Sequence, residues 1–354
     1  MKTIILTGGG SAGHVTPNLA LKPELEKRGY HIEYIGSREG LEKGLAEGAG
    51  LPYHAISTGK LRRYLSLKNL TDPFRVIKGF SEAKKLLKEL QPQVIFAKGG
   101  FVSLPVIKAA KRLGIPTLLH ESDLTPGLAN KLCFKDVAVA LCNFPETLDH
   151  LPAGKSFVSG CPIRAELKEG SRTRALEFAG LSGEKPVLLI IGGSLGSAFL
   201  NQIVRENLDA LLKQFEVLHL CGKGHLAPEL NGRPGYVQYE YVSKEMPDFL
   251  ALADIVLSRA GANAICELLY LKKPMLLVPL PLSASRGDQI LNARSFEKQG
   301  FARVMEQESM TGPLLLEALA SLYEDRARLA AAMESSLQSD AVSFICDKID
   351  EVCG

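Results

Sequence analysis

The chain carries one short motif twice, and this repeat constrains the fold more than any other feature. An apolar strand, a glycine-rich turn and a helix start occur at residues 4–14 and again at residues 187–197. The two turns begin at Gly8 and Gly192, half a chain length apart. Such turns present bare backbone N–H groups at a helix N-terminus, which suits phosphate. The repeat therefore predicts two similar α/β domains, with a nucleotide-bearing substrate in the cleft between them.

Apolar strands alternate with helices in both halves of the chain, which is typical of parallel, doubly wound sheets. The predicted strands are 3–7, 31–36, 94–97, 117–120, 137–141 and 156–159, then 187–191, 216–220, 236–239, 255–258, 275–278 and 302–305. We expect a first domain at residues 1–163 and a second at 164–338. Residues 339–354 are expected to form a C-terminal helix that packs back on the first domain.

The composition is that of a globular protein, with 46% hydrophobic and 23% charged residues. A net charge of only +3 does not favour nucleic acid as a partner. The seven cysteines include no CxxC pair, which fits a reducing cytosol better than a disulfide or zinc framework. No uncharged apolar run reaches the ~18 residues of a membrane span, so any membrane contact is expected to be peripheral.

Two common nucleotide-binding classes fit the glycine turns poorly. A dehydrogenase places an acidic residue at the end of the second strand to bind ribose, but here that strand ends Gly36-Ser37-Arg38. Neither turn is followed by Lys-Ser or Lys-Thr, as a Walker loop requires.

A third glycine turn at residues 98–101 could line the same cleft. A tight turn without a ligand is the alternative for either loop alone.

His14 directly follows the first glycine turn, at the predicted start of a helix. A helix N-terminus lowers the pKa of a histidine, so we expect His14 to be neutral at pH 7. A neutral imidazole can accept a proton from a hydroxyl nucleophile. The alternative is a helix residue that is hydrogen-bonded for structure alone.

Residues 258–267 follow a strand and open a helix, which predicts a second nucleotide contact. The small residues allow close approach of a ligand, and Glu267 comes one to two turns later, where a carboxylate can bind both ribose hydroxyls. A solvated helix residue is the alternative for Glu267. In the polar loop after the 275–278 strand, Gln289 or Asp288 could bind sugar hydroxyls, although Asp288 could equally be a helix N-cap.

Five motifs in this order resemble those of the MurG transferases. They occupy residues 8–14, 120–123 with 126–128, 192–196, 258–267 and 288–293. The resemblance implies the glycosyltransferase B fold, in which two Rossmann-like, doubly wound domains face each other across a cleft. It also implies transfer of N-acetylglucosamine from UDP-GlcNAc to the C4 hydroxyl of the muramoyl sugar of lipid I, with inversion. The product would be lipid II, made for peptidoglycan at the cytoplasmic face of the bacterial cell membrane.

The resemblance also implies roles for single residues, with the acceptor on the first domain and UDP-GlcNAc on the second. His14 is the implied candidate base or acceptor-site residue, and Asp123, which departs from the family pattern, is the second candidate base because its carboxylate could bind or deprotonate the acceptor. The implied substrate-binding residues are Ser11, Ala12, Gly13, Arg164, Ser194, Val242, Ala262, Asn263, Ala264, Ile265, Cys266, Glu267 and Gln289. The sequence has no DxD-type cluster that suggests an obligatory metal, and we expect no cofactor.

Three departures from the family pattern bear on the acceptor. Ser11-Ala12 replaces the usual Thr-Gly, and Phe101 takes the place of a common tyrosine. The usual His-Glu-Gln-Asn becomes His-Glu-Ser-Asp, which puts the carboxylate of Asp123 where the family has an amide. Other functions therefore stay open: a transferase of the same fold with another lipid or natural-product acceptor, a UDP-GlcNAc 2-epimerase, or a non-catalytic nucleotide-sugar binder.

Residues 72–90 predict an amphipathic helix, with Asp72 as N-cap and Pro73 at the first helical position. The expected core stripe is Val76, Phe80, Ala83, Leu87 and Leu90. The opposite face carries Phe74, Ile77, Lys78, Ser81, Lys84, Lys85 and Lys88. Apolar residues among lysines favour an anionic membrane surface, and an ordinary solvated lysine face is the alternative.

Overall fold

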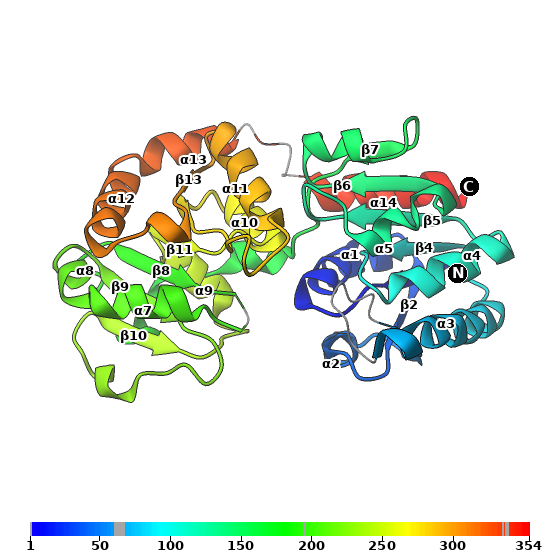
Figure 1. The fold of residues 1–354 in the computed structure, drawn as a ribbon, viewed down its shortest axis with the longest axis horizontal. Coiled ribbons are helices and arrows are strands. Elements are labelled where there is room, and N and C mark those ends of the chain that lie inside the picture. The colour runs from blue at the N-terminus through cyan, green and yellow to red at the C-terminus, as the bar shows by residue number, and fades with distance from the viewer. Residues whose placement is uncertain (1, 60–67, 194, 335, 337–339) are drawn as a thin grey trace. The chain divides into compact units, whose positions relative to one another are not determined.

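The computed structural model describes residues 2–59, 68–193, 195–334, 336 and 340–354, with the backbone alone at 68–73. The chain forms two compact units, Met1–Arg164 with Leu337–Gly354, and Ala165–Ser336. Each unit is a parallel sheet with helices on both faces (Figure 1). The predicted pair of doubly wound α/β domains is therefore confirmed.

Within the described residues, the first unit contains a seven-stranded parallel sheet with the strand order β3-β2-β1-β4-β5-β6-β7. The strands are β1 Lys2–Thr7, β2 Tyr30–Ser37, β3 Tyr53–Ile56, β4 Val94–Ala97, β5 Thr117–Glu121, β6 Val139–Cys142 and β7 Ser156–Val158. Its helices are α1 Thr16–Lys27, α2 Leu41–Gly48, α3 Lys68–Leu90, α4 Ser103–Leu113, α5 Leu128–Lys131 and α14 Ala341–Cys353. Because the strand order reverses between β1 and β4, the loops after these two strands meet at a switch point, where ligands bind in such sheets.

The second unit repeats this plan with the order β10-β9-β8-β11-β12-β13 in the part of the chain that the structure describes. The strands are β8 Val187–Ile191, β9 Glu216–Leu220, β10 Tyr236–Tyr239, β11 Ile255–Ser258, β12 Met275–Leu277 and β13 Ala302–Val304. The helices are α6 Arg172–Ala179, α7 Ala198–Glu206, α8 Leu208–Gln214, α9 Met246–Leu252, α10 Ala262–Tyr270, α11 Asp288–Lys298, α12 Gly312–Glu324 and α13 Arg326–Glu334. Its switch point lies between β8 and β11.

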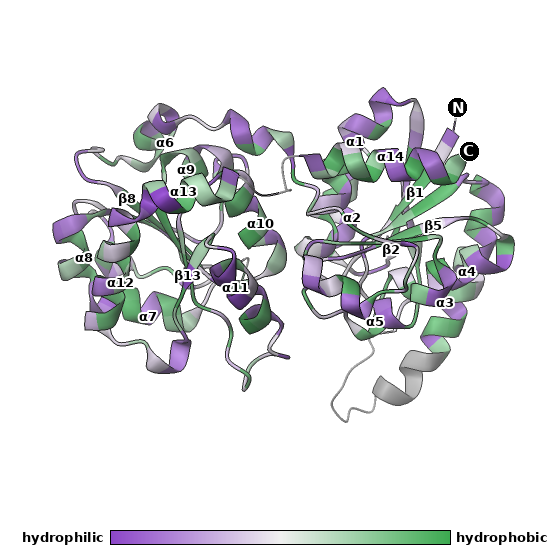
Figure 2. Ribbon diagram, turned by 90° about the horizontal axis from the view of Figure 1, so that it is seen from above, coloured by the Kyte–Doolittle hydropathy of each residue, from purple (hydrophilic) through white to green (hydrophobic). Residues whose placement is uncertain are grey.

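Both faces of the first sheet are buried. Ile4 and Leu6 of β1 enter one core, while Ile5 enters the other, because successive side chains of a strand point to opposite faces. Helices α1 and α14 cover the first core, and α3 and α4 cover the second. Burial on both sides explains why β1 reads as a continuous apolar run. Figure 2 shows such apolar strands between layers of helices striped with hydrophilic and hydrophobic residues.

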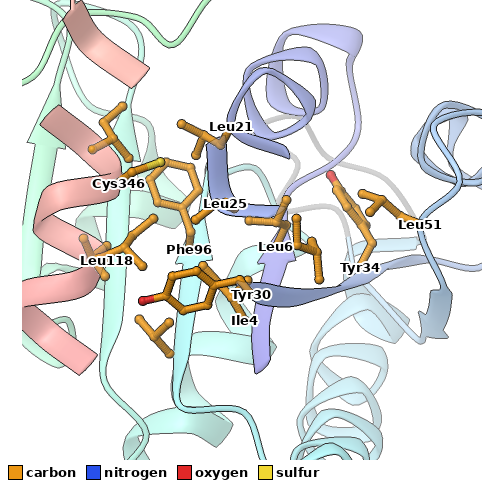
Figure 3. Packing of buried hydrophobic residues seen from close by; sticks show 14 of the residues in the cluster. Ile4, Leu6, Leu21, Leu25, Tyr30, Tyr34, Leu51, Phe96, Leu118 and Cys346 are labelled. Carbon is orange, nitrogen blue, oxygen red and sulfur yellow. The ribbon is translucent and has the colours of Figure 1, made fainter. Parts of the chain in front are cut away.

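The last helix, α14, belongs to the core of the first unit. Its Cys346 packs with Leu21, Leu25 and Phe96 from α1 and β4 (Figure 3). At the helix surface, Arg28 after α1 donates to the Asp347 and Asp350 carboxylates at 2.7 Å each. Apolar burial and these ion pairs tie the C-terminal residues to the N-terminal half of the sequence.

Two predicted boundaries are wrong and one strand was missed. Helix α3 begins at Lys68, so Asp72 is not its N-cap and Pro73 lies inside the helix. The predicted core stripe of α3 is correct, since Phe80, Ala83, Leu87 and Leu90 pack in the second core and Val76 packs against a neighbouring apolar cluster. Strand β3 gave no sequence signal, because it is a half-buried edge strand that includes His54. The strand predicted at 137–141 begins only at Val139, after a short 3-10 turn.

Removing apolar volume from α14 tests its place in the core. We expect Ile349→Ala to lower the free energy of unfolding by about 2–5 kcal/mol, because Ile349 is fully buried and the cavity left behind collapses only partly. Urea unfolding followed by circular dichroism measures the change. Glu351→Ala, on the exposed face of the same helix, is the control and should shift stability little. Equal stability of the two variants would contradict the packing of α14 in this core.

Candidate functional site

The first glycine loop, residues 8–13, leaves the carboxyl end of β1 and leads into a 3-10 turn at Ala12–His14. The hydroxyl of Tyr34 donates to the Gly8 carbonyl oxygen at 2.8 Å, and the Asn18 side-chain amide donates to that of His14 at 3.4 Å. Helix α1 starts two residues after His14, so the prediction that His14 opens this helix is wrong. The buried side chains of Tyr34 and Asn18 therefore hold this loop through its carbonyl groups.

A buried carboxylate lies behind this loop. Glu42 of α2 is fully buried and accepts hydrogen bonds from the backbone N–H of Gly10 at 3.3 Å and of Ser37 at 3.1 Å, and from the Ser37 hydroxyl. The expectation that the first loop offers only bare N–H groups is therefore wrong at Gly10. Sequence reasoning missed Glu42 because it looked for a carboxylate at the end of β2, and this one comes five residues beyond Ser37 on the next helix.

The third glycine turn, after β4, packs directly on the first. Gly99 and Gly100 have φ angles of +91° and +78°, which side chains rarely adopt. A Cβ atom on Gly100 would collide with the Gly9 carbonyl oxygen and would come within 3.4 Å of His14 Nδ1. The same His14 nitrogen lies 3.0 Å from the Ser11 hydroxyl oxygen. The structure thus brings Ser11, Ala12, Gly13 and His14 together with the turn after β4.

Glu121, the last residue of β5, organises the turn that carries Asp123. Its carboxylate accepts from the backbone N–H groups of Ser122 at 2.8 Å, Asp123 at 3.1 Å and Gly127 at 3.1 Å, and from the Asn130 side-chain amide at 2.8 Å. Burial, and then the neighbouring Asp123 carboxylate, raise the pKa of Glu121, while the hydrogen bonds act in the opposite direction. Asp123 itself is partly exposed at the carboxyl edge of the sheet.

A buried lysine fixes the same turn from β4. The Lys98 ammonium lies 2.6 Å from His120 Nδ1 and also donates to the Ser122 hydroxyl oxygen. His120 Nε2 lies 2.9 Å from the Gly160 carbonyl oxygen, which can only accept, so the proton of neutral His120 resides on Nε2. Burial, reinforced by the Lys98 charge, holds the pKa of His120 well below its usual range. Lys98 was not among the residues singled out from the sequence.

In the second unit, the glycine loop after β8 packs on the turn after β9. Gly193 and Gly196 have φ angles of +93° and +77°, and a Cβ on Gly196 would collide with the Cys221 carbonyl oxygen and with Gly222. Ser197 closes the loop and caps α7, because its hydroxyl oxygen accepts the Leu200 N–H at 3.3 Å. Ser194, a predicted ligand residue of this loop, lies outside the described residues.

A buried arginine lies behind the second loop. The Arg259 guanidinium, at the end of β11, donates to the Ser197 hydroxyl oxygen, to the carbonyls of Val278 and Pro279, and to Gln307. No carboxylate of the described residues forms an ion pair with it, and burial lowers its pKa. Arg259 thus joins the loops after β8, β11, β12 and β13 and leaves a positive charge inside the unit.

The predicted residues of α10 divide into two groups. Ala262, Asn263 and Ala264 form its first turn, and Asn263, Ala264 and Glu267 are partly exposed, so these three residues keep access to a ligand, whereas Ala262 is buried. The side chains of Ile265 and Cys266 are fully buried, as is most of Val242 in the loop after β10, so that only their backbones remain for a ligand.

The two remaining candidates lie outside α10. The Gln289 Oε1 atom accepts the Leu280 N–H at 3.1 Å, and its Nε2 donates to no other described residue. Gly287, with a φ of +82°, is the N-cap of α11, so the N-cap role considered for Asp288 is wrong and Asp288 is the first helical residue. Arg164 ends the first unit, and its buried Nε has no partner among the described residues.

Over the described ranges, no group of three or more His, Cys, Asp and Glu side chains is arranged to hold a metal ion.

Comparison with known proteins covers both units. The glycosyltransferase family 28 N-terminal domain matches residues 4–140, and the family 28 C-terminal domain matches residues 187–347. A protein of Lachnoclostridium phytofermentans is 55% identical over 352 residues, and one of Lachnospira eligens is 54% identical over 351 residues, with 99% of each chain covered. Both relatives are named UDP-N-acetylglucosamine–N-acetylmuramyl-(pentapeptide) pyrophosphoryl-undecaprenol N-acetylglucosamine transferase. The crystal structure of Acinetobacter baumannii MurG matches with a TM-score of 0.76 at 25% identity, over 99% of this chain and 100% of that one.

The Glu121 carboxylate can be tested as the organiser of its turn. In Glu121→Gln, an NH2 group replaces one carboxylate oxygen and faces backbone N–H donors that lose their acceptor. We therefore expect the free energy of unfolding to fall by about 1–3 kcal/mol. Amide hydrogen exchange at Ser122, Asp123 and Gly127 should accelerate. Glu39→Gln, at an exposed position of the same unit, is the control and should change neither readout. Unchanged exchange in Glu121→Gln would contradict the role assigned to this carboxylate.

Proposed function

The chain belongs to the MurG family of N-acetylglucosaminyltransferases, and we propose that it transfers N-acetylglucosamine from UDP-GlcNAc to lipid I, forming lipid II for peptidoglycan. The observation that carries this proposal is the length of the similarity. An identity of 55% extends over 99% of this chain and of its relative, and so includes both the donor and the acceptor halves. Lipid I is undecaprenyl-pyrophosphoryl-MurNAc-pentapeptide, whose parts appear in the relatives' name.

The other functions that the sequence left open have no comparable support. A 2-epimerase or a natural-product transferase shares the architecture, but fold alone does not define the substrate. The departures at Ser122-Asp123 lie in a turn whose backbone N–H groups at Ser122, Asp123 and Gly127 donate to the Glu121 carboxylate.

The reaction is a single displacement with inversion. The C4 hydroxyl oxygen of the muramoyl sugar attacks C1 of the N-acetylglucosamine, the bond from C1 to the β-phosphate oxygen breaks, and UDP leaves. A base accepts the hydroxyl proton, and His14 and Asp123 of the first unit are the proposed candidates. Positioned donors and positive charge stabilise the leaving diphosphate.

Charge distribution favours the second unit for the diphosphate. The second glycine loop has the N-terminus of α7 and the Arg259 guanidinium beside it, both of which favour anions. In the first unit, the Glu42 carboxylate already occupies the Gly10 N–H and would repel a phosphate there. We therefore propose that UDP binds to the second unit and that the first unit receives the sugar acceptor.

The remaining donor contacts follow from residues that keep access to a ligand. Glu267 is proposed to bind the ribose hydroxyls, and the Gln289 amide nitrogen to donate to an N-acetylglucosamine hydroxyl. Val242 and the first turn of α10 are proposed to contact the uridine through their backbones. Arg164, Ser194 and the first glycine loop, residues 11–13, complete the proposed substrate contacts.

The outward face of α3 is the proposed docking surface for an anionic membrane. Phe74 and Ile77 are 74% and 66% exposed, and Lys78, Lys85 and Lys88 are also exposed, with Lys84 half-buried. No helix in the described parts of the chain is long and apolar enough to cross a bilayer. A lipid-borne acceptor requires peripheral contact with the membrane, which we place at its cytoplasmic face. Exposed apolar side chains can insert into the membrane interface, and the surrounding lysines attract anionic lipid head groups.

Transfer of labelled N-acetylglucosamine to a lipid I analogue tests the function and its candidate bases. We expect wild-type turnover, and a loss of about 10²–10⁴-fold in kcat for whichever of His14→Ala and Asp123→Asn removes the base, with UDP-GlcNAc affinity unchanged. His150→Ala and Asp149→Asn, at exposed positions of the same unit, are matched controls. A wild-type protein that binds UDP-GlcNAc without transferring to lipid I would overturn the acceptor assignment.

Vesicle sedimentation tests the α3 surface. We expect Phe74→Ser with Ile77→Ser to weaken binding to vesicles that contain anionic lipid by about tenfold or more, because two apolar side chains no longer enter the interface. Transfer to a short-chain acceptor in detergent-free solution should be unaffected. Leu314→Ser, an exposed leucine on α12, is the control. Wild-type vesicle binding by the double variant would exclude this face as the docking surface.

A further inference from the structure

The hydroxyl of Ser197 has an unusual set of hydrogen bonds. Its oxygen accepts from Arg259 Nη2 at 2.7 Å, from Arg259 Nε at 3.1 Å and from the Leu200 N–H at 3.3 Å. Ser197 is only 7% exposed. All three partners are donors, so the oxygen acts solely as an acceptor toward the protein.

The hydroxyl hydrogen of Ser197 is therefore left to donate elsewhere. A serine hydroxyl has one hydrogen and two lone pairs, and the three N–H groups occupy the lone-pair side. Within the described residues, no acceptor receives this hydrogen. It must point away from both Arg259 and Leu200, at the end of the glycine loop and the N-terminus of α7.

Arg259 itself has no N–H group left for a ligand. Its Nε donates to Ser197, its Nη1 to the carbonyls of Val278 and Pro279 at 3.0 and 3.2 Å, and its Nη2 to Ser197 and to Gln307 at 2.7 Å. These five contacts use all five donors of a guanidinium. Every acceptor is neutral, and Arg259 is 7% exposed, so its charge lies inside the unit without an ion pair among the described residues.

A buried cation without a carboxylate is costly unless something anionic balances it. The glycine loop that ends at Ser197 adjoins Arg259, and backbone N–H groups and the α7 dipole favour negative charge there. The fixed positive charge of Arg259 strengthens the binding of an anion at this loop, because the low-dielectric interior screens the charge only weakly.

We infer that Ser197 donates its hydroxyl hydrogen to the diphosphate of the nucleotide sugar, and that Arg259 is the positioning residue that aims this hydroxyl. The inference deepens the proposed function, since it rests on UDP-GlcNAc as the donor bound by the second unit. Ser197 contacts the ligand, whereas Arg259 acts through Ser197 and through its charge.

The chain supplies a matched control for the helix cap. Ser171 caps α6 in the same unit, with its hydroxyl oxygen accepting the Arg174 N–H at 3.3 Å, and no arginine side chain among the described residues donates to that hydroxyl. Ser171→Ala and Ser197→Ala therefore remove the same kind of cap. Only the second removes a hydroxyl that the inference assigns to ligand binding.

Titration calorimetry with UDP and ligand-observed NMR with uridine, which lacks phosphate, test the assignment. We expect Ser197→Ala to bind UDP about tenfold more weakly, since a hydrogen bond to a charged group is lost, and to bind uridine like wild type. Ser171→Ala should match wild type for both ligands. Thermal unfolding of each variant checks that the fold is retained, and Ser197→Gly gives a second variant with a tolerated helix cap.

Arg259→Lys separates two effects of Arg259, its orientation of the Ser197 hydroxyl and its positive charge. Lysine keeps the positive charge but lacks the planar fork that grips one hydroxyl with two N–H groups. We expect UDP affinity to fall in Arg259→Lys, and the double variant with Ser197→Ala to fall by less than the combined single losses, because both act through one hydroxyl.

The outcomes that overturn the inference are distinct from those that overturn the proposed function. Wild-type UDP affinity in Ser197→Ala, or an equal loss for UDP and uridine, would overturn the role of the hydroxyl. Fully additive losses in the double variant would overturn the aiming role of Arg259. A wild-type protein that does not bind UDP would instead overturn the donor assignment itself.

Discussion

Buried charges of opposite sign lie beside the two glycine loops, and the proposed assignment of donor and acceptor to the two units depends on this difference. Behind the first loop, the Glu42 carboxylate accepts the Gly10 N–H. Beside the second loop, the Arg259 guanidinium donates a hydrogen bond to the Ser197 hydroxyl oxygen. The backbone motifs are alike, so sequence similarity of the loops alone does not say where a diphosphate binds. We propose that the charges decide it, because a low-dielectric interior transmits their effect to the loop surface.

Close contact between glycine backbones packs the neighbouring turns of each unit against one another beside these charges. Gly100 approaches the Gly9 carbonyl in the first unit, and Gly196 approaches Cys221 and Gly222 in the second. A side chain at either glycine would force the turns apart. In each unit the loops lie at the carboxyl edge of a parallel sheet whose strands are buried on both faces, so packing fixes the edge from which the loops emerge.

The sequence predicted those parts of the structure whose cause is local. Apolar runs gave almost all the strands, and the 3.6-residue stripe gave the buried face of α3. Residues that act through distant partners gave no signal. Glu42, Lys98 and Arg259 are ordinary charged residues in the sequence, and their importance appears only when folding buries them beside a loop from another segment. The burial of Ile265 and Cys266 was likewise hidden within a motif whose other members stay accessible.

Amide hydrogen exchange of the whole protein with and without UDP tests the central claim most directly, because it maps the ligand onto the chain without any substitution. The account predicts that UDP slows exchange most in residues 192–200 and 258–267 of the second unit, and leaves residues 8–14 and 98–101 of the first unit almost unchanged. Slowing that is strongest in residues 8–14 would contradict it, because the diphosphate would then bind in front of the Glu42 carboxylate.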